Sequence, residues 1–289
     1  MQGILLSGGS GTRLWPITIS TSKQLLPIYD KPLIYYPLST LILSGVTDIA
    51  LITSPDGLVP HQKLIGDGSQ FGIKIEYLIQ EKPTGLPDAF NVARSALDNS
   101  KPCTLILGDN FFYGTGLGQN IFSEIPADSA VCFSYEVSEP ENFGIVKLDK
   151  NNEVEALVEK PKTFVGNLAI PGLYRFPSNV FEFASKLRVS QRGETEIIDL
   201  LNSYLSDSKL IVREMPRGTA WLDTGTPSGM LQASQFVSIL QDRQGLLVGS
   251  PDEVAWRKGL INDKQLRTNA EKYKASNYGK SLFQLLGGK

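Results

Sequence analysis

The stretch Ile4-Leu5-Leu6-Ser7-Gly8-Gly9-Ser10-Gly11-Thr12-Arg13 joins a short apolar run to a glycine-rich turn that ends in an arginine. A short apolar run before glycines is typical of a buried strand that opens into a loop. Because the glycines carry no Cβ, backbone N–H groups can turn toward a polyanion. Arg13 adds a planar, permanently charged fork that can bridge two phosphate oxygens. The stretch therefore predicts a phosphate-binding loop after the first strand of an α/β sheet, where such sheets bind nucleotides.

Two common phosphate-binding loops do not match this stretch. The dinucleotide fingerprint requires glycine at its first, third and sixth positions, but the residues at this spacing are Gly9, Gly11 and Leu14. A P-loop requires lysine and then serine or threonine after its last glycine, whereas Gly8 is followed by Gly9-Ser10. Taken alone, the stretch also fits a tight turn that binds no ligand.

Further short motifs follow this loop in a fixed order along the chain. They are Leu14 with Pro16, Ser22-Lys23-Gln24-Leu25-Leu26-Pro27, Lys31-Pro32, Tyr35-Tyr36-Pro37-Leu38-Ser39, Leu107-Gly108-Asp109-Asn110, Glu159-Lys160-Pro161, Arg192-Gly193-Glu194 and Ala220-Trp221-Leu222-Asp223-Thr224-Gly225-Thr226. Together with the glycine-rich stretch, they resemble the signature of the sugar-nucleotide pyrophosphorylases, and within that group the glucose-1-phosphate thymidylyltransferases. Several ordered blocks arise by chance far less readily than one loop, so we expect a nucleotidyltransferase.

The composition favours a globular protein with a well-packed core. The 289 residues are 41% hydrophobic. No apolar run approaches the roughly 20 residues of a membrane helix, and Met1-Gln2-Gly3 lacks the basic start of a secretory signal. The net charge is −2 and no block of lysine and arginine stands out. We therefore expect neither nucleic acid nor a membrane as a partner, and a cytoplasmic location.

Cysteine and histidine chemistry is nearly excluded by the small number of these residues. Cys103 and Cys132 each lie in an apolar stretch and are expected to be buried, unpaired core residues. A zinc site needs more ligands at close spacing, and His61 is the only histidine. Beside Pro60, it is poorly placed to activate a serine or cysteine nucleophile. The reaction is therefore expected to depend on carboxylates, cations and a metal ion.

Apolar, strand-like segments alternate with amphipathic ones in the first half of the chain, as in a mostly parallel sheet. We expect strands at Ile4–Leu6, Ile49–Thr53, Ile73–Ile79, Thr104–Leu107, Ala130–Glu136, Ile145–Leu148, Val154–Val158, Leu168–Phe176 and Leu210–Met215. We expect helices at Leu33–Leu43, Pro60–Leu64, Pro87–Ala96, Glu194–Leu205, Ser228–Leu240, Pro251–Lys258 and Asp263–Lys272. The predicted fold is a single Rossmann-like α/β domain, with a mixed, mostly parallel central sheet flanked by helices. We place its catalytic part, which includes the sugar-binding part, at residues 1–226, and a helical appendage packed on the same domain at 227–289.

Two aspartates stand where apolar segments pass into glycine-containing turns. Asp109 follows the expected strand Thr104–Leu107, at the sheet edge where ligands bind. Asp223 lies between Leu222 and Thr224-Gly225. Taken alone, Asp109 also fits a turn-capping role. A carboxylate pair suits Mg²⁺, which proteins bind through one or two carboxylates plus substrate phosphate oxygens. The resemblance implies that both aspartates hold the catalytic Mg²⁺.

The resemblance also implies roles for individual side chains. Arg13 and Lys23 are similar to the residues that bind the triphosphate, and Lys160 to the lysine that binds the sugar phosphate. With Asp109 they form the expected catalytic set. The expected nucleotide site contains Leu6, Gly8, Gly9, Ser10, Gly11, Thr12, Arg13, Gln80 and Gly85, the last two recognising the thymine ring. The expected sugar-phosphate site contains Phe143, Gly144, Glu159, Lys160, Ile170, Glu194 and Trp221.

The reaction implied by the resemblance is thymidylyl transfer from dTTP to α-D-glucose 1-phosphate, which gives dTDP-glucose and pyrophosphate. It opens dTDP-rhamnose biosynthesis. A sugar phosphate is already ionised near neutral pH, so the attack on the α-phosphorus needs no general base. This agrees with the presence of a single histidine. The resemblance further implies a homotetramer that is inhibited by a downstream dTDP-sugar.

Several positions depart from the family pattern and leave substrate choice open. They are Gly85-Leu86-Pro87-Asp88-Ala89 in place of Gly-Leu-Ala-Gln-Ala, Phe143 in place of tyrosine, Ile170-Pro171-Gly172 in place of Val-Thr-Gly, and Pro227 in place of histidine. None of them changes the expected catalytic or metal-binding residues. The alternatives are a pyrophosphorylase that uses UTP or another hexose 1-phosphate, an inactive sugar-nucleotide-binding regulator, and a less well matched NAD-dependent dehydrogenase.

Overall fold

A ten-stranded sheet forms the centre of the computed structural model, which describes residues 1–9, 11–190 and 193–287. Its strand order is β10-β9-β11-β8-β12-β6-β1-β4-β5, and β13 pairs with β8. The strands are β1 (Gln2–Ser7), β4 (Asp48–Thr53), β5 (Lys74–Ile79), β6 (Cys103–Leu107), β8 (Ala130–Glu136), β9 (Gly144–Leu148), β10 (Val154–Glu159), β11 (Leu168–Ala169), β12 (Leu173–Phe176) and β13 (Leu210–Glu214). Pairing is parallel across β6-β1-β4-β5 and antiparallel where β12 joins β6 and β8. The α/β class and the mixed sheet with a parallel centre are therefore confirmed.

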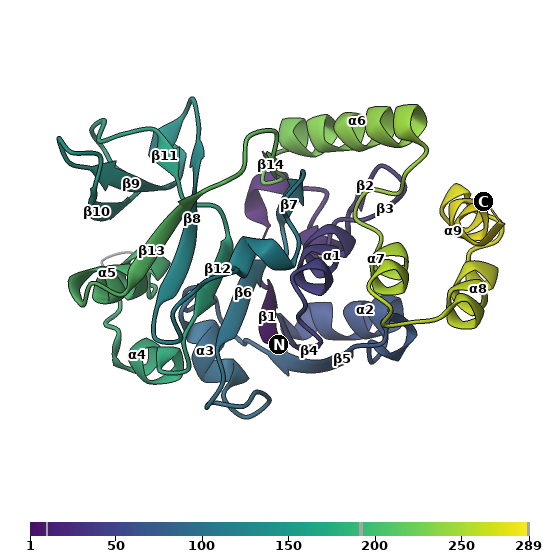
Figure 1. The fold of residues 1–289 in the computed structure, drawn as a ribbon, viewed down its shortest axis with the longest axis horizontal. Helices are drawn as coiled ribbons and strands as arrows, with labels where there is room; N and C mark the ends of the chain where they lie inside the picture. Colours follow the sequence, from purple (N-terminus) through teal and green to yellow (C-terminus); the bar gives the residue numbers. More distant parts are fainter. Residues whose placement is uncertain (10, 191–192, 288–289) are drawn as a thin grey trace.

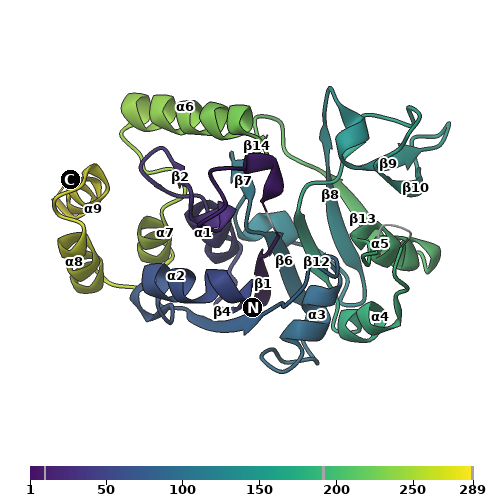
Figure 2. The same cartoon turned by 180° about the vertical axis from the view of Figure 1, so that it is seen from behind.

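Helices cover both faces of this sheet (Figures 1 and 2). They are α1 (Tyr35–Leu43), α2 (Pro55–Ile65), α3 (Asp88–Ala93), α4 (Val180–Lys186), α5 (Ile197–Ser206), α6 (Pro227–Gln244), α7 (Pro251–Arg257), α8 (Asp263–Lys272) and α9 (Asn277–Gly287). Neighbouring residues of a strand point to opposite faces. Ile4 accordingly packs in one hydrophobic cluster with α3, α4 and α5, and Leu5 in another with α1 and α7 to α9. Burial of both faces explains the uninterrupted apolar run of β1.

Two short antiparallel pairs stand outside the main sheet. β7 (Asn110–Tyr113) pairs with β14 (Ala220–Asp223), and the register sets Asp223 opposite Asn110. β2 (Pro27–Ile28) pairs with β3 (Lys31–Pro32). A third hydrophobic cluster joins these pairs to α6: Ile28, Leu33, Tyr36, Phe111, Ala233, Val237 and Val248. Because β7 begins just after β6 ends, its pairing with β14 places Asp223 close to the end of β6, at the edge of the main sheet.

The C-terminal helices lie along one side of the molecule, with α8 and α9 at the end opposite β9 and β10 (Figure 1). α6 begins at Pro227, whose missing N–H costs little in a first helical turn. Thr226 caps this helix, since its Oγ1 accepts a hydrogen bond from the N–H of Gly229 at 3.1 Å. The boundary at residue 226 stays a prediction. Among the described residues, no helix is long and apolar enough to cross a membrane.

The sequence prediction is wrong for the segment Leu168–Phe176, which forms two strands instead of one. The segment Ile170-Pro171-Gly172 separates β11, which pairs with β8 and β9, from β12, which pairs with β6 and β8. Pro171 has no N–H to donate to a strand ladder, which favours a break at this position. The prediction also missed α4, α9, β7 and β14. These strands have four residues each, and α9 contains Gly279, which weakens a helical signal.

Candidate active site

Three adjoining cavities open near the carboxyl ends of β1 and β6, and Asp109 lines all three. The loop cavity, of about 210 Å³, is lined by Gly8, Gly9, Gly11, Thr12, Arg13, Leu14, Lys23, Gln24, Asp109 and Gly225. The side cavity, of about 290 Å³, is lined by Leu6, Gly8, Gly9, Gln24, Gln80, Pro83, Gly85, Leu86, Leu107, Asp109 and Glu194. The large cleft, of about 820 Å³, extends from Arg13 and Asp109 to Glu159 and Lys160. All predicted site residues within the described ranges line one or more of these cavities, and Ser10 lies outside those ranges.

The glycine-rich loop follows β1 directly and borders the loop cavity. Gly9 and Gly11 have φ values of 100° and 60°, a region of backbone conformation that favours glycine. Two side chains hold the loop from outside: Gln24 Nε2 donates to Gly8 O at 3.0 Å, and Thr18 Oγ1 donates to Gly11 O at 2.7 Å. Held by these bonds, the loop lines the loop cavity, which Arg13 and Lys23 also line. The arrangement suits a polyanion.

Lys23 and Asp109 form an ion pair where the cavities meet. Lys23 Nζ lies 2.8 Å from Asp109 Oδ2, and Asn110 Nδ2 donates to Asp109 Oδ1 at 3.0 Å. Burial raises the pKa of the Asp109 carboxyl, but the Lys23 ammonium and the hydrogen bonds from Lys23 and Asn110 outweigh it, so the pKa lies below its usual value. Asp109 is therefore an ionised carboxylate at neutral pH.

Asp223 brings a second carboxylate to the same cleft from the end of β14. Its Oδ1 accepts the N–H of Gly225 at 2.8 Å, and Thr224 Oγ1 donates to Asp109 O at 2.7 Å. A Cβ on Gly225 would lie 2.9 Å from both Arg13 Nη2 and Asp223 Oδ1, so this position has to be small. No cluster of three or more His, Cys, Asp or Glu side chains forms a cage for a metal ion in the described part of the chain. Two carboxylates beside a phosphate-sized space fit Mg²⁺, whose other ligands are then substrate and water oxygens.

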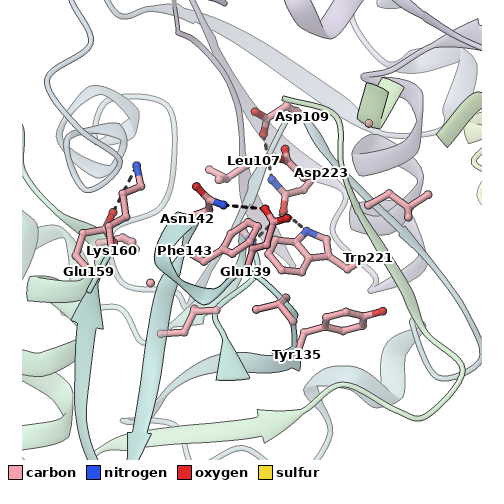
Figure 3. Close-up of a pocket in the computed structure, with 18 of the residues that line it drawn as sticks. Leu107, Asp109, Tyr135, Glu139, Asn142, Phe143, Glu159, Lys160, Trp221 and Asp223 are labelled. Atoms are coloured by element: carbon pink, nitrogen blue, oxygen red, sulfur yellow. Dashed lines mark hydrogen bonds and ion pairs between the residues drawn. The ribbon is translucent and has the colours of Figure 1, made fainter. Parts of the chain in front are cut away.

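The far end of the large cleft is built from β9, β10 and the segments that follow them. In Figure 3, Glu159 and Lys160 lie at one side, Asp109 and Asp223 lie in the upper middle, and Phe143 and Trp221 lie below the two aspartates. Lys160 has a left-handed backbone, with φ 42°, and its N–H donates to Phe143 O at 3.0 Å. A Cβ at Gly144 would lie 2.7 Å from Ile198 Cδ1 and 3.3 Å from Glu159 Oε2. Glycine at 144 therefore keeps this end of the cleft open, and Ile170 and Glu194 complete its wall.

Asn110 connects Asp109 to the aromatic wall of the cleft, a role that its sequence position alone did not reveal. Besides its bond to Asp109, its Oδ1 accepts from Trp221 Nε1 at 2.7 Å and from the N–H of Gly172 at 3.1 Å. The Trp221 ring packs against Phe143 with 5.1 Å between centroids. One amide thus fixes the distance between the carboxylate and the aromatic wall. Its position directly after Asp109 was the only signal, and its partners depend on the β7–β14 register.

His61 contacts a serine, but this pair lies in the core and not in a cavity wall. Its Nε2 lies 2.7 Å from Ser7 Oγ, and its Nδ1 lies 2.6 Å from Gly57 O. Both His61 and Ser7 are buried, with exposed fractions of 0% and 1%. A substrate has no access to the Ser7 hydroxyl, so the pair holds the end of β1 against α2 and does not form a nucleophile.

Comparison with known proteins gives a family for this arrangement. A family model for nucleotidyl transferases matches residues 2–239. A glucose-1-phosphate thymidylyltransferase of Mycolicibacterium smegmatis is 48% identical over 286 residues, which cover 99% of each chain. A glucose-1-phosphate thymidylyltransferase of Neisseria gonorrhoeae is 45% identical over 288 residues, which cover 99% of this chain and 100% of that one.

Solved structures extend the likeness to the fold. A protein from Bacillus anthracis, assigned as a glucose-1-phosphate thymidylyltransferase and crystallised with sucrose, aligns with a TM-score of 0.75 at 33% identity. That alignment covers 82% of this chain and 94% of the other. A UDP-glucose pyrophosphorylase bound to UDP-glucose aligns with a TM-score of 0.70 at 22% identity, over 82% of this chain and 98% of the other, and supports the fold alone.

Proposed function

This chain belongs to the nucleotidyl transferase family, and on that premise we propose that it transfers a thymidylyl group from dTTP to glucose 1-phosphate, giving dTDP-glucose and pyrophosphate. The observation that carries the proposal is the meeting of three cavities at Asp109. The nucleoside, the triphosphate and the sugar phosphate each need a pocket, and the three pockets have to meet where the α-phosphorus of the nucleotide lies. The loop cavity suits the triphosphate, the side cavity the base and the large cleft the sugar phosphate.

The reaction is an in-line displacement at the α-phosphorus. A phosphate oxygen of glucose 1-phosphate forms the new bond as the bond to pyrophosphate breaks, and no proton has to be removed from the nucleophile. Arg13 and Lys23 line the loop cavity, where they offset charge on the departing pyrophosphate. Lys160 lines the opposite end of the cleft, where it holds the phosphate of the sugar. Alignment and charge stabilisation are therefore the main sources of rate enhancement.

Mg²⁺ is the cofactor that this site would take, with Asp109 and Asp223 as its protein ligands. When bound, the ion supplies positive charge to the phosphate oxygens. The low pKa of Asp109 supports this role, because the carboxylate is ionised at the pH at which the ion binds. Because Lys23 forms an ion pair with Asp109, the lysine and a bound ion would share this carboxylate.

The experiment that tests the function measures pyrophosphate release with Mg²⁺ and glucose 1-phosphate for dTTP, UTP, CTP, ATP and GTP in turn. Preference for dTTP is the expected result. Turnover with UTP alone moves the chain to another pyrophosphorylase of the same fold, and turnover with none of them favours a binding protein. Omission of Mg²⁺ should abolish the release.

Assembly, regulation and location extend the proposal. We propose a homotetramer, which the exposed apolar side chains of α6 support: Leu231 and Ile239 are 60% and 62% exposed. Light scattering would give the assembly size. We also propose feedback by a downstream dTDP-sugar, which an initial rate unchanged by saturating dTDP-rhamnose would contradict. The buried, unpaired Cys103 and Cys132 support a reducing, cytoplasmic location.

A further inference from the structure

The side-chain amide of Gln80 is held by two neighbours at the wall of the side cavity. Its Nε2 lies 3.2 Å from Asp88 Oδ2 and 3.1 Å from Thr84 Oγ1. Thr84 donates its own hydroxyl hydrogen to the same carboxylate oxygen of Asp88, so toward Gln80 it acts as an acceptor. The NH₂ group of the amide thus faces two neighbouring acceptors, which are hydrogen-bonded to each other.

Asp88 can only accept hydrogen bonds while it is ionised. Burial raises the pKa of its carboxyl, but hydrogen bonds from Thr84, Asn91 and Gln80 outweigh it, so the pKa lies below its usual value. The second oxygen, Oδ1, accepts from Asn91 Nδ2 at 3.2 Å. An acceptor-only group beside the amide permits one orientation, with the NH₂ toward Asp88 and the carbonyl oxygen away from it.

The carbonyl oxygen of Gln80 is left on the cavity side. Oε1 lies 3.5 Å from the position that a Cβ on Gly8 would occupy, and Gln80 and Gly8 both line the side cavity. Whatever occupies that cavity therefore meets a hydrogen-bond acceptor from this side chain. Thymine and uracil carry an N–H at ring position 3, which pairs with an acceptor, whereas the nitrogen of cytosine at that position is itself an acceptor.

We propose that Asp88 is a positioning residue that determines pyrimidine specificity: it fixes the Gln80 amide so that Oε1 selects a base with an N–H at position 3 and rejects cytosine. This inference rests on the proposed function, which puts the base in the side cavity. With cytosine, Gln80 Oε1 would face the ring nitrogen at position 3. Both atoms are acceptors with no hydrogen between them, so neither would be hydrogen-bonded. A site built for one hydrogen-bonding pattern discriminates strongly against the opposite one.

The test compares kcat/KM for dTTP, dCTP and UTP, each with glucose 1-phosphate, in wild type and D88N. The asparagine side chain of D88N can donate as well as accept a hydrogen bond. The Gln80 amide can therefore rotate by about 180° and direct its NH₂ group to cytosine. We expect the dTTP:dCTP ratio to fall at least ~10-fold, while the dTTP:UTP ratio stays the same because both bases carry the N–H. The matched control is N91A, which removes the partner of the other oxygen of Asp88 and should keep both ratios.

A double-mutant cycle separates this role from a structural one. In a Q80A background, D88N should leave the dTTP:dCTP ratio unchanged, because Asp88 acts through Gln80. Structural damage in D88N would lower turnover of all nucleotides alike, and an unchanged dTTP:dCTP ratio in active D88N overturns the inference. If D88N binds nucleotides without turnover, the dissociation constants of dTTP and dCTP give the same ratio. Wild-type protein that is inactive with dTTP overturns the proposed function instead, so the two failures are distinguishable.

Discussion

Lys23 Nζ and Asp109 Oδ2 lie 2.8 Å apart at the point where the three cavities of the active site meet. The Lys23 side chain is only 7% exposed, and the two residues are far apart in the sequence. The Lys23 ammonium helps to hold the pKa of the Asp109 carboxyl below its usual value. A substitution at Asp109 removes this carboxylate from the place where the three cavities meet and therefore tests the proposed chemistry directly.

Asp109→Asn should lower kcat by at least ~10²-fold, as removal of a principal electrostatic group often does. The substitution keeps the shape of the side chain and removes the charge that a metal ion needs. Pyrophosphate release at saturating substrates gives kcat, and Asp128→Asn, at an exposed aspartate remote from the cavities, is the control. Turnover close to that of wild type would disprove the metal-binding role of Asp109.

Lys160→Ala should raise KM for glucose 1-phosphate by about 10-fold or more, since a hydrogen bond to a charged group is lost. KM for dTTP should change little, because the lysine lies at the opposite end of the cleft from the loop cavity. Lys162→Ala removes an exposed lysine two residues away and serves as the control. A change confined to dTTP would reassign Lys160 to the nucleotide.

Ser7→Ala alone should destabilise the fold by about 1 to 3 kcal/mol, because it leaves the buried Nε2 of His61 without its partner. His61→Phe alone leaves the Ser7 hydroxyl in the same position. The double substitution replaces both polar groups by apolar ones and should recover most of the loss. Urea unfolding of the four proteins measures these free energies, and strictly additive losses would show that the two side chains are uncoupled.

Stability should fall below about pH 6.5 in a way that depends on His61. Burial lowers the pKa of His61 from its ordinary value of 6.5. Below pH 6.5, His61 binds a proton in the unfolded chain but stays neutral in the folded one. The contribution of His61 to the free energy of unfolding is therefore complete above pH 6.5. It declines as the pH falls from 6.5 toward the pKa of His61 in the folded state.

The measurement is the free energy of unfolding at pH 7.5 and 5.5 for wild type and for the Ser7→Ala, His61→Phe double variant. Carboxylates titrate in both proteins and cancel in the difference. Wild type should lose more stability than the variant between the two pH values. Parallel losses would mean that His61 titrates equally in the folded and unfolded states.

The sequence predicted the parts of the fold whose signal is local. β1, β4 and β6 are buried on both faces, so each appears as an uninterrupted apolar run. Glycines and carboxylates at the ends of such runs marked the loop cavity and Asp109. The segment Leu168–Phe176 has the same apolar character; Pro171 favours the break within it, but the different partners of β11 and β12 depend on the rest of the sheet.

Contacts within the site were harder to foresee because they depend on strand register. The link from Asn110 to Trp221 exists because β7 and β14 pair with Asp223 opposite Asn110, and nothing in either short segment specifies that alignment. The Asp88 contact to Gln80 depends instead on the path of the loop between β5 and α3, because Gln80 directly follows β5 and Asp88 begins α3. The sequence identified Asp88 as unusual but did not indicate its partner.

The continuous sheet also limits how this molecule can move. β12 joins the half of the sheet that contains β6 to the half that contains β8: it pairs with β6 through Leu173–Phe176 and with β8 through Tyr174 and Arg175. Swinging one half relative to the other would break this backbone ladder, at a cost of about 1 kcal/mol for each hydrogen bond. The sheet therefore resists a change in the separation of its two halves. On the proposed function, the sheet therefore sets the separation between the loop cavity and the Lys160 end of the cleft before either substrate binds.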